Sequence, residues 1–277
     1  MQHPKLFLKV GNNPEFNIAD KVPGLEYLGD NATPVINNSF LDVSGVDGSQ
    51  YQFTTFSRYQ VPANFFLRFG DWQDFKLAKH QFYRLFAQRK EMRMRTDVES
   101  GIVRFVYPTL PEIKPAEDGA HYAQFTMNFD NPSGYRYSLY RSNAKHDFAS
   151  DSFQFGEFDV SEEPTYHFTS TAFSVYNPSD IPIDPFGQKH DLKVVCKFSG
   201  SSLKLTNTTN GSEWEYKNSS SGSDSIILDG IDTTLNGNPA SVNTDYGNLI
   251  LDTGWNSFTV NGASSVDITF SFPFIYL

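Results

Sequence analysis

Short apolar runs separated by turn residues fill the second half of the chain and restrict that half to an all-β fold. Between residues 165 and 277 there are eight such runs, punctuated by Asn, Gly, Ser and Pro. Apolar and polar residues alternate within many of them, which places the apolar side chains on one face of a strand. Eight short strands with this punctuation predict an antiparallel β-sandwich.

One segment of the first half, residues 72–90, has the pattern of a helix instead. Asp71 can cap its first turn, and Arg89 and Lys90 at the far end complement the helix dipole. Leu77 lies nearly opposite the apolar stripe, where it is either an isolated surface leucine or a contact with another subunit. The stripe itself recurs at helical spacing and is predicted to be buried: Phe75, Ala78, Phe82, Leu85 and Phe86.

Most of the remaining first half is predicted to be strand. Residues 91–98 and 101–108 flank a short Glu-Ser-Gly turn and predict a hairpin, and residues 121–129 alternate like a half-buried strand. Asp42 and Asp47, in the stretch LDVSGVDGS, resemble a calcium loop only in part. The alternating oxygen ligands and the closing Glu of such a loop are missing, so we interpret this stretch as a turn.

Charge is distributed unevenly along the chain. Residues 1–144 carry 16 Lys and Arg against 15 Asp and Glu, a net charge of +1, whereas residues 145–277 carry 6 against 17, a net charge of −11. This asymmetry predicts two domains, residues 1–144 and 145–277, that meet in the polar stretch 140–152. The acidic half should repel nucleic acid and anionic membranes, so neither is an expected partner.

The common signatures of catalysis and metal binding are missing from the sequence. It contains no G-x-S-x-G elbow, phosphate-binding loop or dinucleotide fingerprint, and its six histidines never pair at metal-ligand spacing. We therefore expect no enzyme activity, no cofactor and no metal. A single cysteine, Cys196, excludes an internal disulfide framework and is expected on the buried face of a strand.

Glu213, Trp214 and Glu215 form the one candidate sugar site. On a strand the two carboxylates share a face about 7 Å apart, a separation that suits an inverting glycosidase. Nothing nearby would desolvate one carboxylate and raise its pKa, so catalysis is disfavoured. Trp214 points the other way and either stacks on a sugar ring or packs between two sheets, and we favour packing in the core.

The only basic cluster of the sequence begins in the last turns of the predicted helix, where the helix dipole favours cations. The simplest interpretation is a solvated face, and the alternative is a channel wall or a contact with a partner. The cluster consists of Arg84, Arg89, Lys90, Arg93 and Arg95.

The order of these elements resembles the distal tail protein (Dit) family of bacteriophages with long, non-contractile tails. Residues 41–56 and 65–86 are similar to the N-terminal belt domain of that family, and residues 102–108 and 122–138 to its later strands. In the second half, five segments match the family's galectin-like domain in order and spacing: AFSVYNPSDIPIDP, LKLTNTTNGSEWEY, DSIILDGI, TDYGNLILDTGWNSFTVNGA and VDITFSFPFIYL.

The resemblance implies a mainly β protein with two domains, a belt domain with one α-helix and a galectin-like antiparallel sandwich. It implies a hexameric ring at the tail tip of the virion, synthesised in the cytoplasm of the bacterial host. Such a ring joins the tail tube protein to the tail-associated lysin or fibre protein, and the galectin-like domains can carry a receptor-binding protein.

Four residues of this chain are candidates for contacts within the ring: Leu77, Arg84, Arg93 and Arg95. The alternative function is that of a lectin-like protein that recognises glycans of the host cell wall. The sugar-binding signature of true galectins, a His-Asn-Arg cluster with Trp-x-x-Glu, is missing, which argues against that alternative.

Overall fold

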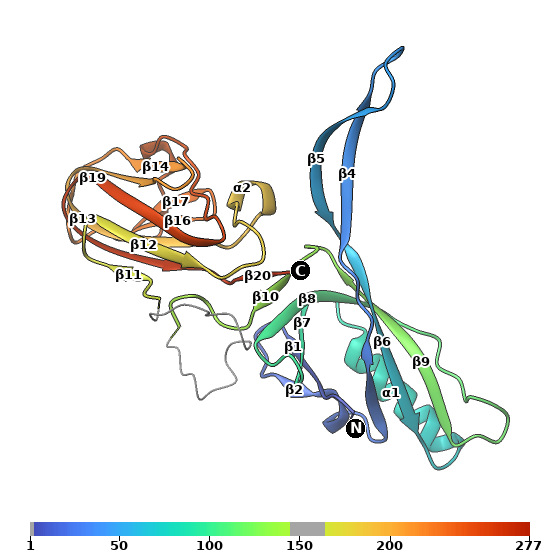
Figure 1. Ribbon diagram of the computed structural model, residues 1–277. Helices are drawn as coiled ribbons and strands as arrows, with labels where there is room; N and C mark the ends of the chain where they lie inside the picture. Colours follow the sequence, from blue (N-terminus) through green and yellow to red (C-terminus); the bar gives the residue numbers. More distant parts are fainter. Residues whose placement is uncertain (1–2, 145–163) are drawn as a thin grey trace. The chain divides into compact units, whose positions relative to one another are not determined.

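A computed structural model describes residues 3–144 and 164–277 of the chain (Figure 1). The chain divides into two compact units, Met1–Arg136 with Leu277 and Tyr137–Tyr276. Both are built mainly of antiparallel strands, which confirms the predicted fold class. The expected boundary between residues 144 and 145 falls at the edge of the segment 145–163, which lies outside the described residues, and it stays a prediction.

The first unit is built on an antiparallel sheet with the strand order β2-β1-β7-β8-β9-β6-β3. The predicted hairpin is the pair β7–β8, in which Met92 lies opposite Val106. The predicted alternating strand is β9, which pairs with β6 along its whole length. The strands are β1 (Leu6–Val10), β2 (Phe16–Asn17), β3 (Leu25–Asp30), β6 (Tyr59–Arg68), β7 (Met92–Thr96), β8 (Ile102–Thr109) and β9 (Tyr122–Asn131), and a 3-10 turn, Ile18–Asp20, precedes β3.

Helix α1 (Trp72–Phe86) begins where the sequence predicts and ends earlier. Asp71 caps it, because the carboxylate accepts hydrogen bonds from the backbone N–H groups of Gln73 and Asp74, both at 2.8 Å. The helix ends at Phe86 rather than at residue 90, since residues 88–91 are all polar and nothing there extends the buried stripe. Of the predicted stripe, all members are buried except Leu85, which is half-buried.

Aromatic side chains join α1 to the sheet in the core of the first unit. The ring of Phe65 on β6 stacks on Phe125 of β9 at a centroid distance of 5.5 Å. Phe82 of α1 meets Phe65 edge-on at 5.7 Å and packs against Phe86 at 4.5 Å. Burying a side chain of this size stabilises a fold by about 1.5–3 kcal/mol, so this cluster fixes the helix on the sheet.

Two further strands of the first unit, β4 (Val35–Asp42) and β5 (Ser49–Ser57), form a sheet of their own. They follow β3 and precede β6, and Figure 1 shows them as a long hairpin that extends beyond the ends of those strands. The turn predicted around Asp47 lies at the tip of this hairpin. At the base, a Cβ on Gly134 would lie 2.7 Å from the carbonyl oxygen of Ser57, so only glycine permits this close approach.

In the second unit, a nine-stranded antiparallel sheet folds into the predicted sandwich around two long strands, β13 (Lys193–Asn207) and β19 (Gly254–Ser271). Their register shifts between Ser199 and Lys204, where a Cβ on Gly200 would lie 2.4 Å from the carbonyl oxygen of Gly262. The other strands are β11 (His167–Phe168), β12 (Ala172–Asn177), β14 (Glu213–Tyr216), β15 (Ser220–Ser221), β16 (Ile226–Asp229), β17 (Asp232–Leu235) and β18 (Asn238–Pro239).

Beyond the register shift, each long strand changes its neighbours. The first part of β19 lies between β12 and the last part of β13, which in turn pairs with β14. The first part of β13 pairs with β16 and with the last part of β19. Cys196 lies on this first part and is fully buried with Leu192, Val194 and Phe198, which confirms its predicted position in the core. Burial raises the pKa of the Cys196 thiol far above its usual value, so the group stays protonated.

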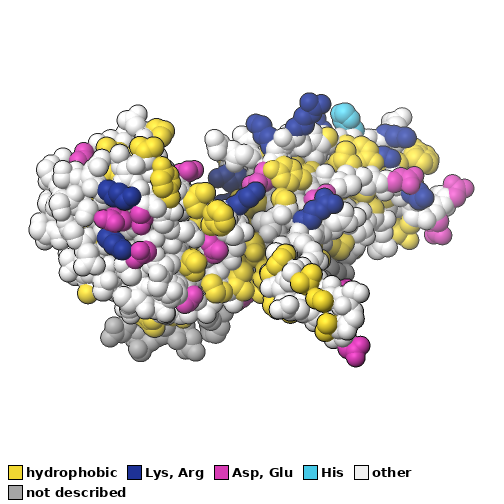
Figure 2. All heavy atoms as spheres, turned by 90° about the horizontal axis from the view of Figure 1, so that it is seen from above, with side chains coloured by type: hydrophobic (Ala, Val, Ile, Leu, Met, Phe, Trp, Pro, Cys, Tyr) yellow, Lys and Arg dark blue, Asp and Glu magenta, His cyan; other side chains and the backbone are white. Residues whose placement is uncertain are grey.

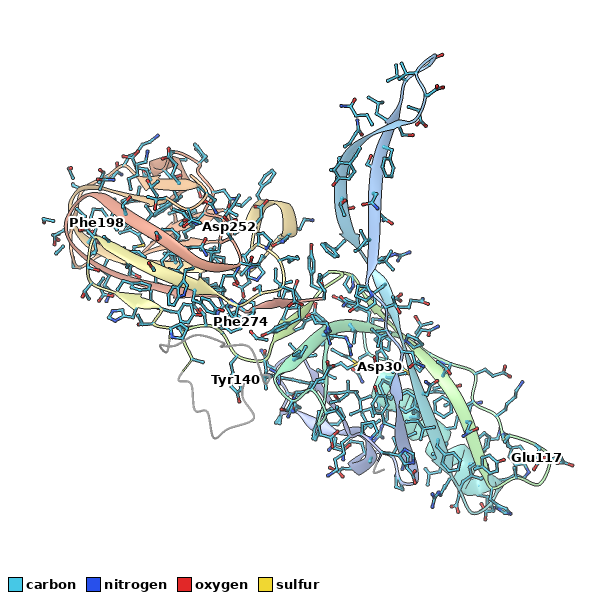
Figure 3. All side chains as sticks on the ribbon, viewed as in Figure 1. Asp30, Glu117, Tyr140, Phe198, Asp252 and Phe274 are labelled. Carbon is cyan, nitrogen blue, oxygen red and sulfur yellow. The ribbon has the colours of Figure 1, made fainter. Side chains whose placement is uncertain are left out.

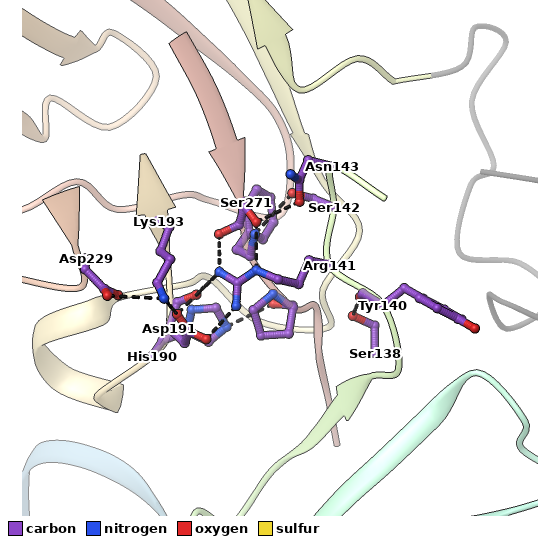
Figure 4. A network of polar contacts seen from close by, with 12 residues as sticks. Ser138, Tyr140, Arg141, Ser142, Asn143, His190, Asp191, Lys193, Asp229 and Ser271 are labelled. Carbon is purple, nitrogen blue, oxygen red and sulfur yellow. Dashed lines mark hydrogen bonds and ion pairs between the residues drawn. The ribbon is translucent and has the colours of Figure 1, made fainter. Parts of the chain in front are cut away.

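Polar contacts tie the beginning of the second unit to its last strands (Figure 4). Arg141 donates from Nε to the Ser271 hydroxyl at 2.7 Å, and its Nη1 pairs with the carboxylate of Asp191 at 2.5 Å. The short strands β10 (Arg136–Ser138) and β20 (Ile275–Tyr276) also pair with each other. Two further short helical segments, α2 (Pro185–Gln188) and a 3-10 turn at Ser241–Asn243, lie in loops of this unit.

Candidate assembly surfaces

The β4–β5 hairpin carries a series of exposed large apolar side chains. Their exposed fractions run from 40% at Val35 to 64% at Val46. Hydrophobic side chains lie open along the hairpin in the space-filling view (Figure 2), and side chains project from both of its faces (Figure 3). The exposed apolar residues of the hairpin and its tip are Val35, Ile36, Phe40, Leu41, Val43, Val46, Tyr51 and Phe53.

The pairing of the strands places these side chains on both faces of the hairpin. Phe40 lies opposite Tyr51, with ring centroids 6.0 Å apart, and Leu41, the next residue along, points to the other face. A bulge between Ser39 and Phe40 shifts the register in the middle of the ladder. A two-stranded sheet is marginally stable in water, so a surface that covers this hairpin would stabilise it.

The sequence predicts the turn of this hairpin and a first half rich in strands, but it does not place the two strands of the hairpin. The available signal was the pair of runs VINNSFLD and SQYQFTTFS on either side of a turn that contains two glycines. Apolar residues on both faces, together with the bulge, disturb the simple alternation that identifies a half-buried strand.

The outer face of α1 carries two of the predicted contact residues. Leu77 is 56% exposed, as its place opposite the buried stripe predicts. Arg84 is also exposed and lies seven residues, close to two full turns, after Leu77, so both side chains lie on one face of the helix. This face is unoccupied among the described residues and can take a partner.

Arg93 and Arg95 have a partner within the chain, where the sequence suggested a neighbouring subunit. Arg93 Nη2 lies 2.8 Å from one carboxylate oxygen of Glu15, and Arg95 Nη2 lies 2.5 Å from the other. The guanidinium group of Arg95 also covers the ring of Phe7 at 4.6 Å. Pairing of β7 with β1 brings these groups together, because Glu15 lies between β1 and β2, beside the end of that ladder.

The environment of Glu15 favours its ionised form. Burial by itself raises the pKa of this carboxyl group, but the hydrogen bonds and charges of Arg95 and Arg93 outweigh burial and lower its pKa below the usual value. The three side chains therefore form a charged cluster within the chain, in which Nε of Arg93 is buried without a hydrogen-bond partner, and Arg84 is the exposed cation of the predicted contact set.

The candidate sugar site at Glu213, Trp214 and Glu215 is divided between the two faces of β14. Trp214 is only 1% exposed, and its indole N–H donates to the hydroxyl of Thr233 at 3.3 Å. A side chain this deeply buried has no face to offer a sugar, so the core-packing interpretation of Trp214 fits the structure. Glu213 lies on the outer face, paired with Lys204 at 2.8 Å.

Within the described ranges 3–144 and 164–277, no three His, Cys, Asp or Glu side chains lie together in a way that could hold a metal ion. Over the same ranges, no helix is long and apolar enough to span a bilayer.

Comparison with known sequences finds a similarity within the first unit. Residues 12–131 match the phage tail protein RIFT-related domain. This range lies within the first unit. No curated protein sequence matches the chain.

Comparison with solved structures covers both units. The Dit protein of phage SPP1, described as a paradigm of the hub adsorption apparatus in phages that infect Gram-positive bacteria, matches with a TM-score of 0.64 at 10% identity. The match covers 97% of this chain and 99% of that protein. The chain therefore has the fold of a distal tail protein, which confirms the predicted resemblance.

Two chains from the baseplate of phage p2 in its activated conformation also match. The one determined with strontium has a TM-score of 0.42 at 9% identity, and the one determined with calcium has 0.43 at 10% identity. Both matches cover 98% of this chain and 98% of the other. TM-scores of this size carry no conclusion about this chain.

Proposed function

We propose that this protein forms the ring-shaped hub at the tip of a phage tail. The ring joins the tail tube to the tail-associated lysin or fibre protein and to the receptor-binding apparatus. Six subunits are the number implied by the resemblance to distal tail proteins. The observation that carries the proposal is the exposed apolar β4–β5 hairpin, which extends from a domain of a phage tail family.

The hairpin is long enough to reach a neighbouring subunit. The 9 residues of β5, at about 3.3 Å per residue, span roughly 30 Å, which is comparable to the width of a small domain. A ring needs a heterologous contact, in which one patch of a subunit meets a different patch of the next. The hairpin supplies the first patch, and the outer face of α1 with Leu77 and Arg84 is our candidate for the second.

Charge and burial both favour crowding of the first domain. Residues 1–144 carry a net charge of +1, so their copies repel one another little, whereas residues 145–277 at −11 are better placed facing outward. Each apolar side chain of the hairpin that becomes buried contributes about 1.5–3 kcal/mol. Several together offset the roughly 4–15 kcal/mol that association costs in lost freedom.

Replacement of Phe40 by Asp tests the role of the hairpin. This side chain is exposed and outside both cores, so the variant should fold normally but assemble at least tenfold more weakly, because a charge would be buried in the contact. The measurement is the mass distribution of the full-length protein by analytical ultracentrifugation over a range of concentrations.

The control is Val242→Asp, which changes an apolar side chain of the second unit that is even more exposed than Phe40 and should leave assembly unchanged. Assembly of the Phe40→Asp variant at the wild-type concentration would contradict the proposed role of the hairpin. The alternative function, a lectin-like protein, loses Trp214 as its stacking residue and needs a different site.

A further inference from the structure

Unlike Trp214, the other tryptophan of the second unit is exposed on the outer face of the sandwich. Trp255 on β19 is 48% exposed and stands directly opposite Tyr176 on the neighbouring strand β12. The two ring centroids are 5.1 Å apart with the planes inclined at 52°. Asn256 and Val175, the adjacent residues of the two strands, are fully buried, so Trp255 and Tyr176 both point outward.

The aromatic pair contributes little to the core of the unit. The inward positions of the same two strands are already filled by Val175 and Phe258, which are buried. Exposing half of an indole group to water costs more free energy than exposing the serine or threonine side chains at the neighbouring outward positions. A position of this kind is best explained by a ligand that covers it.

Hydroxyl groups border the pair on the same face. Ser257 follows Trp255 at the next outward position of β19, and Ser174 on β12 lies opposite Ser257. On the other side of β19, the exposed Thr208 donates its hydroxyl hydrogen bond to the carbonyl oxygen of Ser257 at 3.0 Å. An apolar platform is therefore flanked by the exposed hydroxyl groups of Ser174 and Ser257, which can donate and accept hydrogen bonds, and by that of Thr208, which can accept one.

From this arrangement we propose that Tyr176 and Trp255 form a binding platform for an uncharged saccharide. The apolar C–H face of a pyranose ring stacks on the aromatic side chains, while its hydroxyl groups exchange hydrogen bonds with Ser174 and Ser257 and donate to Thr208. An open sheet face, rather than a closed pocket, suits a run of sugar residues within a longer polysaccharide.

Charge decides which class of saccharide fits. Residues 145–277 carry 6 Lys and Arg against 17 Asp and Glu, so a polymer that bears phosphate or carboxylate groups would be repelled. Lys204 of β13 is already paired with Glu213. An uncharged glycan meets neither obstacle.

Several copies of the sandwich would together bind a polysaccharide more tightly than one weak platform does. Single stacking sites of this size hold a ligand weakly, but a ring with several sandwiches facing outward binds a repetitive polysaccharide at many points. This increase in avidity rests on the proposed hub function, whereas the platform itself does not.

The test is a glycan array of bacterial surface polysaccharides, probed with the full-length protein, followed by saturation-transfer NMR with the saccharides that bind. The array includes uncharged polymers and a glycerol-phosphate teichoic acid. We expect at least one uncharged saccharide to bind and the teichoic acid not to bind. Trp255→Ala and Tyr176→Ala should each weaken binding at least tenfold while the near-ultraviolet circular dichroism of the sandwich core is kept.

Trp72→Ala serves as the control, because it removes an exposed tryptophan of the first unit and should leave binding unchanged. Three results would overturn the proposal: no uncharged saccharide binds, only the teichoic acid binds, or binding survives both platform variants. Retention of a protein partner through Trp255 without any saccharide binding would also overturn it. Ring formation is read separately by ultracentrifugation, so failure of the platform leaves the hub proposal standing.

Discussion

At the scale of single residues, the two tryptophans of the second unit show how much a local pattern determines. Alternation along EWEYK predicts that Trp214 points away from both glutamates, and the structure places it in the core. The sequence does not predict that the Thr233 hydroxyl accepts a hydrogen bond from the indole N–H of Trp214, because only the fold of the sheet brings β14 and β17 together. It also gives no reason to single out Trp255, whose outward direction depends on the register between β12 and β19.

This contrast gives a prediction for stability. Trp214→Ala should lower the free energy of unfolding of the second unit by about 3–5 kcal/mol, because it leaves a large cavity. Trp255→Ala should cost less than about 1 kcal/mol, because the side chain packs on one partner and is half exposed. Chemical denaturation of both variants provides the comparison, and equal losses would contradict the assignment of one tryptophan to the core and one to the surface.

A second prediction at the residue scale concerns Glu15 and the pH dependence of the unfolding free energy. Its pKa is lower in the folded state than the 4.5 of an unperturbed glutamate, so its cluster with Arg93 and Arg95 stabilises the fold fully above that pH. The contribution is lost as the pH falls below 4.5 and passes through the lower folded-state pKa. The difference in unfolding free energy between wild type and Glu15→Gln should therefore shrink as the solution is acidified from pH 6 to pH 3. A difference that stays constant over this range would count against the cluster.

At the scale of elements, α1 was predictable and the β4–β5 hairpin was not. The cap at Asp71, the buried stripe and the exposed Leu77 all follow from helical spacing over a single continuous segment. The hairpin strands lack a one-sided apolar pattern, because neither of their faces packs on a core. Sequence periodicity reports on burial within the chain, and strands that are exposed on both faces leave a weaker signal.

The cap of α1 can be tested directly. Asp71→Ala removes the carboxylate that accepts from Gln73 and Asp74 and should lower the free energy of unfolding of the first unit by about 1 kcal/mol. Gln73→Ala is the matched control, because it keeps both backbone donors and places a good helix former in the first turn. If thermal or chemical unfolding gives the same stability for wild type and Asp71→Ala, the cap does not support the helix.

At the scale of the whole molecule, the order of the elements carried more information than any single motif. The division of charge between the halves and the change from mixed elements to short strands both predict two units. Composition gives no account of how β13 and β19 run through the whole sandwich, since that depends on glycine contacts at Gly200 and Gly262. The contacts of Arg93 and Arg95 were missed for a related reason, because Glu15 is distant in sequence and only the β1–β7 ladder brings it near.

The hub proposal is a statement about the whole molecule, and electron microscopy of the full-length protein with its tail tube and fibre partners tests it most directly. We expect closed rings in which the first units form the inner circle, the β4–β5 hairpin of each subunit contacts its neighbour, and the acidic sandwiches face outward. A protein that stays monomeric at high concentration, with those partners present, would contradict the proposal.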